Sequence, residues 1–121
     1  TNPLSVADCA AAAKALDICD SPEGREHLEH LKEMTTRFRQ GIENLGWQSI
    51  PGPHPIVPLL VGDTPRTHKL VQHLFDRDIL AVGLTLPVVP RGDETLRFQI
   101  NAAHTEADID SVLKALASFR A

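Results

Sequence analysis

The 121-residue sequence lacks most of the features that would assign it to a specialised class of protein. No apolar run is long enough to cross a bilayer and no signal peptide is visible, so we expect a cytoplasmic protein without membrane contact. The net charge is -4 and the lysines and arginines are scattered, which argues against nucleic acid as a partner. No repeat, P-loop, nucleophile elbow, G-x-G-x-x-G or C-x-x-C motif occurs, so no common catalytic or nucleotide-binding signature is present.

Cysteine is also scarce, and the two residues present cannot pair with each other. Cys9 and Cys19 fall in one predicted helix, where ten residues span about 15 Å, far beyond disulfide reach. We therefore expect both to be small buried apolar residues in a protein from a reducing compartment. A catalytic thiol is the weaker alternative, because no histidine is near either cysteine in the sequence.

Apolar periodicity and capping residues predict four helices. The first covers residues 5–18 and is rich in alanine, which favours a helix but buries little surface. The second starts at Ser21-Pro22-Glu23, with a serine N-cap followed by proline. The third starts at Thr64-Pro65, and the fourth has Thr105 as N-cap and Asp108 in the capping-box position. The residues expected to face the core are Leu28, Leu31, Phe38, Ile42 and Leu45, then Leu70, Val71, Leu74 and Phe75, then Ile109, Val112, Leu113, Leu116 and Phe119.

Three strands complete the pattern. Residues 56–61 are apolar on both faces, which predicts that both faces are covered. Because proline cannot donate to the ladder, Pro58 predicts that this strand lies at an edge or is interrupted there. Residues 79–82 predict a short strand ending at Gly83, and residues 96–101 predict a strand with alternating apolar and polar side chains. The order of elements predicts an α+β domain: a small open, mainly antiparallel sheet with helices packed on one face.

The length suits a single domain over residues 1–121 with a modest core. Apolar residues on the first helix and on both faces of the strand at residues 56–61 exceed what this core needs. They predict an apolar surface around Val57, Leu59 and the alanine-rich helix that a second body covers. The chain begins at Thr1 rather than at Met, as expected of a piece excised from a longer protein.

The strand at residues 96–101 carries the main functional candidate. Its leucine, phenylalanine and isoleucine share one face, and its polar residues share the other. The polar face presents Arg97 beside the proline-rich loop Pro87–Pro90. A guanidinium can donate two parallel N–H bonds to the two oxygens of a carboxylate, so Arg97 is the candidate substrate-binding residue. The alternative is a solvated strand face without a ligand.

The six histidines give little support for a metal site. Four of them lie on predicted helices, namely His27, His30, His68 and His73. No pair among these four has the i, i+4 spacing of zinc-binding helices, so we expect ordinary structural roles and no metal ligand. His54 precedes a strand, and His104 lies where it would cap the last helix or orient the loop before it.

No catalytic centre stands out. The acidic residues closest together flank helix starts, where a negative charge favours the helix dipole; they are Asp17, Asp20, Glu23, Glu106 and Asp108. The lysines lie on predicted helices and are interpreted as surface residues, whereas a Schiff-base lysine needs a desolvated pocket; they are Lys14, Lys32, Lys69 and Lys114. One substrate anchor without a catalytic group predicts a substrate-binding or lid domain cut from a larger enzyme.

Four segments resemble one family of enzymes. They are LPVVPRGDETLRFQINAAHTEADID at residues 86–110, TNPLSVADCAAAAKAL at 1–16, HPIVPLLVGD at 54–63 and DRDILAVGLTLPVVP at 76–90. They resemble the last third of the α-oxoamine synthases, which are pyridoxal-phosphate (PLP) enzymes of the fold type I aminotransferase superfamily and include the 2-amino-3-ketobutyrate CoA ligase and 8-amino-7-oxononanoate synthase types. The resemblance implies a small C-terminal domain whose large PLP-binding domain is missing.

The resemblance also implies a role for Arg97. In this family, the arginine in the strand after the P-x-V-P loop binds the carboxylate of the amino-acid substrate. The lysine, aspartate and stacking histidine that hold the cofactor lie in the large domain, and their motifs do not occur here. The fragment alone is therefore expected to bind no cofactor, to have no catalytic residue and to be inactive.

The implied parent enzyme is a homodimeric, PLP-dependent acyltransferase. It would condense glycine or alanine with an acyl-CoA to a 2-amino-ketone and release CoA. Thr95 departs from the family, since many members have arginine there, while Pro87–Pro90 and Gln99 resemble the branch that uses glycine and a short acyl-CoA. Two alternatives stay open: the C-terminal domain of a class I/II aminotransferase, and a free-standing regulatory module that binds a small carboxylate.

Overall fold

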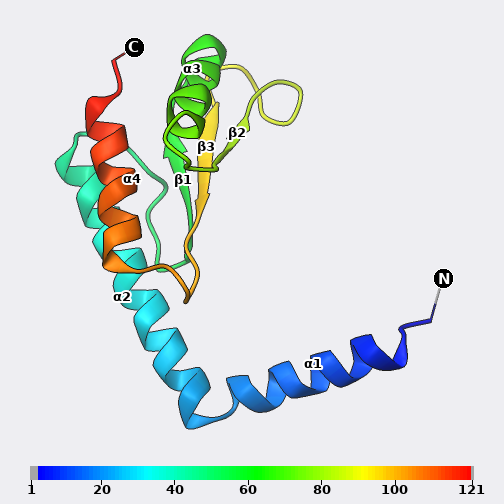
Figure 1. Cartoon of the computed structure of the whole chain (residues 1–121). Helices are drawn as coiled ribbons and strands as arrows, with labels where there is room; N and C mark the ends of the chain where they lie inside the picture. Colours follow the sequence, from blue (N-terminus) through cyan, green and yellow to red (C-terminus); the bar gives the residue numbers. More distant parts are fainter. Residues whose placement is uncertain (1–2, 121) are drawn as a thin grey trace.

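The computed structural model describes residues 3–120, which form four helices and three strands (Figure 1). In chain order they are α1 (Val6–Cys19), α2 (Pro22–Asn44), β1 (Ile56–Leu60), α3 (Thr64–Phe75), β2 (Val82–Leu84), β3 (Thr95–Gln99) and α4 (Glu106–Ser118). The number and order of the predicted elements are confirmed. None of the helices in the described part of the chain is long and apolar enough to cross a membrane.

The three strands form one open antiparallel sheet in the order β1-β3-β2. β3 is central, and the register pairs Leu96 with Leu59 of β1 and with Gly83 of β2. β1 is an edge strand, as Pro58 predicts. Helices α2, α3 and α4 cover one face of the sheet (Figure 1), which confirms the predicted α+β class.

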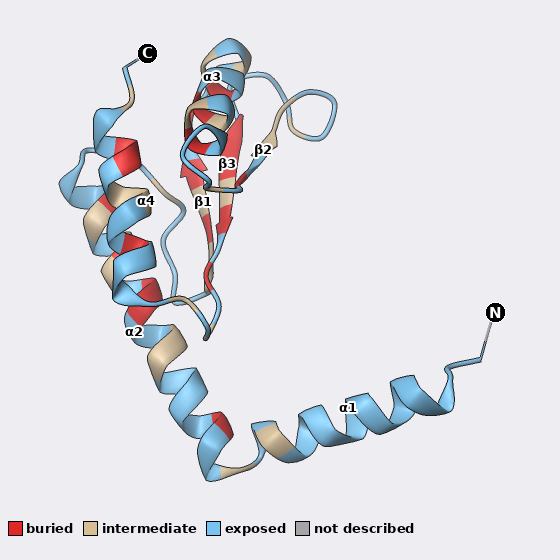
Figure 2. Cartoon of the chain, viewed as in Figure 1, coloured by how far each residue is buried: buried red, intermediate tan, exposed pale blue. Residues whose placement is uncertain are grey.

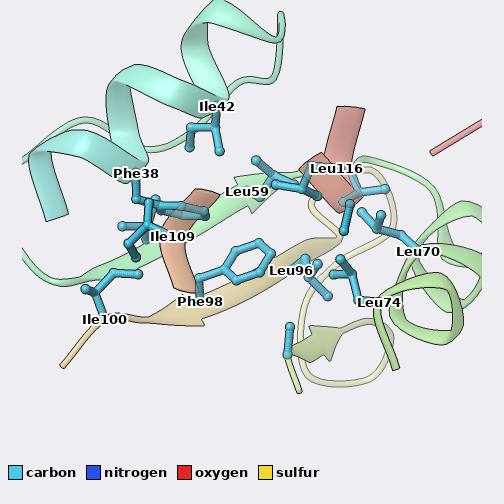
Figure 3. Close-up of a cluster of buried hydrophobic side chains, with 14 of the residues drawn as sticks. Phe38, Ile42, Leu59, Leu70, Leu74, Leu96, Phe98, Ile100, Ile109 and Leu116 are labelled. Atoms are coloured by element: carbon cyan, nitrogen blue, oxygen red, sulfur yellow. The ribbon is translucent and has the colours of Figure 1, made fainter. Parts of the chain in front are cut away.

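The core lies between β3 and these three helices (Figure 3). Leu96 and Phe98 point inward from β3, as the alternation predicts, and Val57 and Leu59 do so from β1. The ring of Phe98 packs against Phe38 of α2 with centroids 5.0 Å apart. Each fully buried side chain of this kind contributes about 1.5–3 kcal/mol relative to an exposed one, so this packing fixes where the opposite face of β3 points.

Capping residues start the helices largely where the sequence predicts. Ser21 caps α2 by accepting a hydrogen bond from the Gly24 amide at 3.2 Å, with proline in the next position. Thr105 and Asp108 form the predicted capping box of α4. The N-cap of α3 is Asp63, one residue before the expected start, because its carboxylate accepts a hydrogen bond from the Arg66 amide at 2.7 Å.

Several predicted core positions are wrong. Leu28 and Leu45 of the second helix and Phe75 of the third are exposed, and the buried positions include Met34 and Thr35 instead. The apolar residues at helical spacing extend past the part of each helix that packs on the core. Periodicity alone therefore overestimates how much of the helix is buried.

The short strand also differs from the prediction. β2 covers Val82–Leu84 rather than residues 79–82. Gly83 faces α3 from the middle of the strand, and a Cβ at this position would lie 3.0 Å from Val71 and 3.1 Å from Thr67. The glycine therefore permits the close approach of helix and strand instead of ending the strand.

α1 extends away from the sheet and packs against α2 (Figure 1), and none of its residues is buried (Figure 2). Cys9 and Cys19 are free, as predicted, but both are exposed rather than buried. The expected apolar surface around Val57 and Leu59 is also wrong, because both side chains are fully buried in this chain. The exposed leucine of β1 is Leu60, on the opposite face.

The two capping boxes allow a matched test of which helices share the cooperative unit. In this chain, Thr105→Ala should lower the free energy of unfolding by about 1 kcal/mol, because α4 packs into the core. Ser5→Ala removes the equivalent cap of α1, which has no buried residue, and should change the free energy of unfolding by less than about 0.5 kcal/mol. Urea denaturation measures both free energies of unfolding. Equal decreases in the two variants would contradict the prediction that α4, but not α1, unfolds together with the core.

Candidate functional site

Arg97 lies in the middle of the sheet face that the helices leave open. Cross-strand pairing places it beside Pro58 of β1 and Val82 of β2, and paired residues share a face. The next row has Thr95 between Leu60 and Leu84. The open face is therefore a polar central strand between two apolar edge strands.

The apolar edges and the adjoining loops enclose a hollow of about 630 Å³ that includes Arg97. Ile50, Leu60, Leu84 and Val89 are among its apolar residues. The lining also includes the acidic residues Asp93 and Glu94, and Arg97 is the cation in it. The apolar part of the wall favours an anionic ligand at Arg97, because it excludes the water that otherwise screens the charge.

The guanidinium of Arg97 has no hydrogen bond or ion pair with another described residue, and its Nε is buried without a partner. By contrast, Arg37 binds Asp110 through two hydrogen bonds of 2.9 and 3.0 Å. A half-buried arginine with an unsatisfied donor has unused capacity for a ligand, and a carboxylate matches the geometry of its fork. The structure thus places Arg97 where the alternation predicts.

Glu94 is a buried carboxylate in the lining of the hollow, and no pattern in the sequence selects it. It accepts hydrogen bonds from the Thr64 hydroxyl at 2.7 Å and the Gly92 amide at 2.8 Å. Its carbonyl accepts from the amides of Val61 and Gly62 at 2.9 and 3.0 Å. The bond from Thr64 is the largest of the effects that hold the pKa of Glu94 below its ordinary value. Because this carboxylate is satisfied locally, it leaves the fork of Arg97 free.

The loop before β3 is anchored at both ends. The Thr85 carbonyl accepts hydrogen bonds from the amides of Val88 and Val89 at 2.8 and 3.2 Å, and Glu94 holds the far end. Gly92 has a φ of 95°, a left-handed conformation that glycine adopts without strain. The proline-rich loop therefore lies beside the Arg97 hollow, as predicted, with Val89 in its lining.

The candidate histidines have structural contacts. His104 orients the loop before α4: its Nδ1 accepts from the Asn101 amide at 3.2 Å, and its carbonyl lies 2.8 Å from Nε2 of His30. His54 accepts from the Ile56 amide at 3.1 Å through Nδ1. Among the described residues, no cluster of three or more histidine, cysteine, aspartate or glutamate side chains is arranged to hold a metal ion.

The residues of this chain do not fit the covalent anchoring of a PLP cofactor. The cofactor's lysine linkage requires a desolvated amine, and every lysine of the chain is exposed on a helix. The described part of this chain therefore offers an unpaired arginine but no lysine suited to that linkage.

The described part of the chain is thus a small α+β domain with an unpaired arginine on its open sheet face. Residues 2–116 match the family described as aminotransferase class I and II. The chain belongs to this family.

The relatives confirm the resemblance to the α-oxoamine synthases. The 8-amino-7-oxononanoate synthase of Marinobacter nauticus is 38% identical over 120 residues, which cover 99% of this chain and 30% of that enzyme. The enzyme of the same name from Aeromonas salmonicida is 38% identical over 113 residues, covering 93% and 28%. The chain thus spans less than a third of the length of these curated relatives.

Solved structures show the same fold. A serine palmitoyltransferase from S. paucimobilis matches with a TM-score of 0.89 at 23% identity, over 98% of this chain and 30% of that one. An 8-amino-7-oxononanoate synthase from Francisella tularensis matches with a TM-score of 0.73 at 16% identity, over 89% and 30%. The fold is therefore that of one part of the fold type I PLP enzymes, as predicted.

The hydrogen bonds of Glu94 predict a pH dependence. Its pKa is lowered in the folded state, so its contribution to stability is present at neutral pH. It is lost as the pH falls from about 4.3, the ordinary glutamate value, through the lower native value. In Glu94→Gln, the free energy of unfolding should vary less with pH across this window. Chemical denaturation at a series of pH values measures this dependence.

Glu26→Gln is the control for net charge, because it removes a carboxylate from the exposed surface of α2. Thr64→Val tests the cause, since it removes the hydroxyl that donates to Glu94. This variant should shift the acid loss of stability to higher pH. Identical profiles for Glu94→Gln, Glu26→Gln and the wild type would refute the assignment.

Proposed function

We propose that this chain is the substrate-binding part of a longer PLP-dependent acyltransferase, in which Arg97 binds the carboxylate of an amino-acid substrate. The observation that carries the proposal is the unpaired guanidinium in an apolar hollow on the open sheet face. The names of the curated relatives and the resemblance of the loop and strand around Arg97 support the same reaction class. The chain alone is expected to be inactive.

Arg97 would act by binding and orienting the substrate. Two parallel N–H bonds to a carboxylate fix the direction of the adjacent carbon, so that one of its bonds faces the reacting group supplied by the rest of the protein. The cofactor supplies an electron sink when it is bound by that other part. The apolar walls of the hollow would strengthen the ion pair by limiting its hydration.

The reaction proposed for the whole protein is condensation of a small amino acid with an acyl-CoA to a 2-amino-ketone, with release of CoA. The carboxylate of the amino acid either stays in the product or leaves as CO2. The names of the relatives describe a nine-carbon product with neighbouring amino and keto groups, which fits such a condensation with a longer acyl group. Gln99 and Pro87–Pro90 point instead to glycine and a short acyl-CoA. Activity with acyl-CoA thioesters of increasing length distinguishes the two branches.

The remaining partners are proposed on the same basis. A large PLP-binding domain would belong to the same protein, because the matched relatives are more than three times as long as this chain. Its lysine and the other cofactor-binding groups would lie outside this chain. A homodimer of the whole protein is the expected assembly.

Arg97→Ala in the full-length protein should raise the KM for the amino acid by roughly 10-fold to 100-fold, because the carboxylate loses its charged partner and its orientation. Arg97→Lys keeps the charge but not the fork, so it should restore only part of the loss. Steady-state kinetics with varied amino acid and saturating acyl-CoA measure the effect.

Arg37→Ala is the matched control, because this arginine binds Asp110 and Glu106 on the outer surface, away from the hollow. Unchanged kinetics for Arg97→Ala would remove Arg97 from the site. Amino-group transfer to a keto acid without any dependence on acyl-CoA would favour the aminotransferase alternative instead.

A further inference from the structure

The outer edge of β1 is covered by a short segment that precedes it. The Ile50 amide donates to the Pro58 carbonyl at 3.3 Å, the Leu60 amide donates to the Gln48 carbonyl at 2.8 Å, and Ser49 forms an isolated bridge with Leu59. These contacts share one antiparallel register, so residues 48–50 extend the sheet by a fragment of a fourth strand.

This added ladder lacks one hydrogen bond for a covalent reason. Ile50 and Pro58 form a hydrogen-bonded pair, in which each residue normally donates its amide to the carbonyl of the other. Proline has no N–H, so the Ile50 carbonyl cannot receive its bond from β1. An edge strand tolerates this only where another donor or water satisfies that carbonyl.

Arg39 of α2 supplies the missing donor. Its Nη1 donates to the Ile50 carbonyl at 2.8 Å, and its Nη2 donates to the His54 carbonyl at 3.0 Å, with a longer contact of 3.4 Å to the Ile56 carbonyl. One guanidinium thereby ties Ile50, the last residue of this segment, to the carbonyls of His54 and Ile56 at the start of β1. Charged donors form stronger hydrogen bonds than neutral amides do, so this clamp replaces the bond that Pro58 cannot make.

The clamped segment is also a wall of the Arg97 hollow. Gln48 and Ile50 line the hollow together with Pro58 and Leu60 of the adjoining edge strand. Pro58 pairs directly with Arg97, so a displacement of residues 48–50 would open the hollow on that side. Arg39 itself is not among the residues that line it.

We infer that Arg39 is a positioning residue of the substrate site: by replacing the donor that Pro58 lacks, it holds Gln48 and Ile50 in place as the wall beside Arg97. The inference rests on the proposed function, since it assigns a role around the carboxylate site. Arg39 acts only through the segment it binds and does not touch the substrate.

The test uses Arg39→Met, Arg39→Lys and Arg37→Met in the full-length protein. Arg39→Met keeps much of the side-chain volume but removes all three hydrogen bonds. It should raise the KM for the amino acid by roughly 10-fold, with kcat within about threefold of the wild type, because a shifted wall weakens binding more than chemistry. Arg39→Lys should restore part of the loss. Arg37→Met removes an arginine of the same helix that does not bind the segment, and it should leave both constants unchanged.

A second measurement reports on the segment directly. Hydrogen exchange in a peptide containing Leu60 should be at least about 10-fold faster in Arg39→Met, because the Leu60 amide bonds to the Gln48 carbonyl. Pro58→Ala in the Arg39→Met background restores an N–H opposite the Ile50 carbonyl, so it should slow this exchange again. Arg37→Met should leave the exchange unchanged.

The outcomes separate the two proposals. A raised KM in Arg97→Ala with an unchanged KM in Arg39→Met overturns the positioning role and leaves the proposed function standing. The same fall in kcat and the same rise in KM in Arg39→Met and Arg37→Met would also overturn the positioning role of Arg39, since they would show only general destabilisation of α2. No effect of Arg97→Ala refutes the proposed function, and the role assigned to Arg39 falls with it.

Discussion

The packing of the inner face of β3 against α2 is the contact on which the rest of the molecule depends. Leu96 and Phe98 are held among buried side chains of the core, and Phe98 meets the ring of Phe38. Successive side chains of a strand point to opposite faces. Burial of one row therefore fixes the direction of Arg97 on the other, without any contact to the guanidinium itself. The domain holds Arg97 in place through apolar packing on the far side of the sheet.

Several polar groups around this core are satisfied locally. The carboxylate of Glu94 is held by Thr64 and Gly92, and the guanidinium of Arg37 binds Asp110. Arg39, Arg66 and Arg97 each have a buried Nε without a partner among the described residues, and of these three only Arg97 lines the hollow. The proposed site needs no strained backbone, because it depends on the guanidinium of Arg97, which has no partner among the described residues. The lysines of the chain are exposed on helices, whereas a reacting amine needs a dry pocket, so none of them is suited to hold a cofactor covalently.

α1 shows the opposite relation between local and tertiary order. Its capping box and alanine content favour a helix, yet none of its residues is buried (Figure 2), and Val6 and Leu16 are exposed. Short isolated helices are marginal in water. The match to less than a third of each curated relative accords with a helix whose partner surface lies in the rest of a longer protein.

The amino-acid sequence by itself determined the number and order of the elements, the caps at Ser21 and Thr105, the edge position of β1 and the face on which Arg97 lies. Each of these follows from local rules: capping, the missing amide of proline and the alternation of a strand. Only the tertiary structure decided that Phe75 and the cysteines are exposed, that Gly83 lies within a strand, and that Glu94 is buried. It also decided that Arg39 reaches the Ile50 carbonyl. These outcomes depend on which surfaces meet when distant segments pack, and residue patterns along the chain do not encode the length or the angle of that contact.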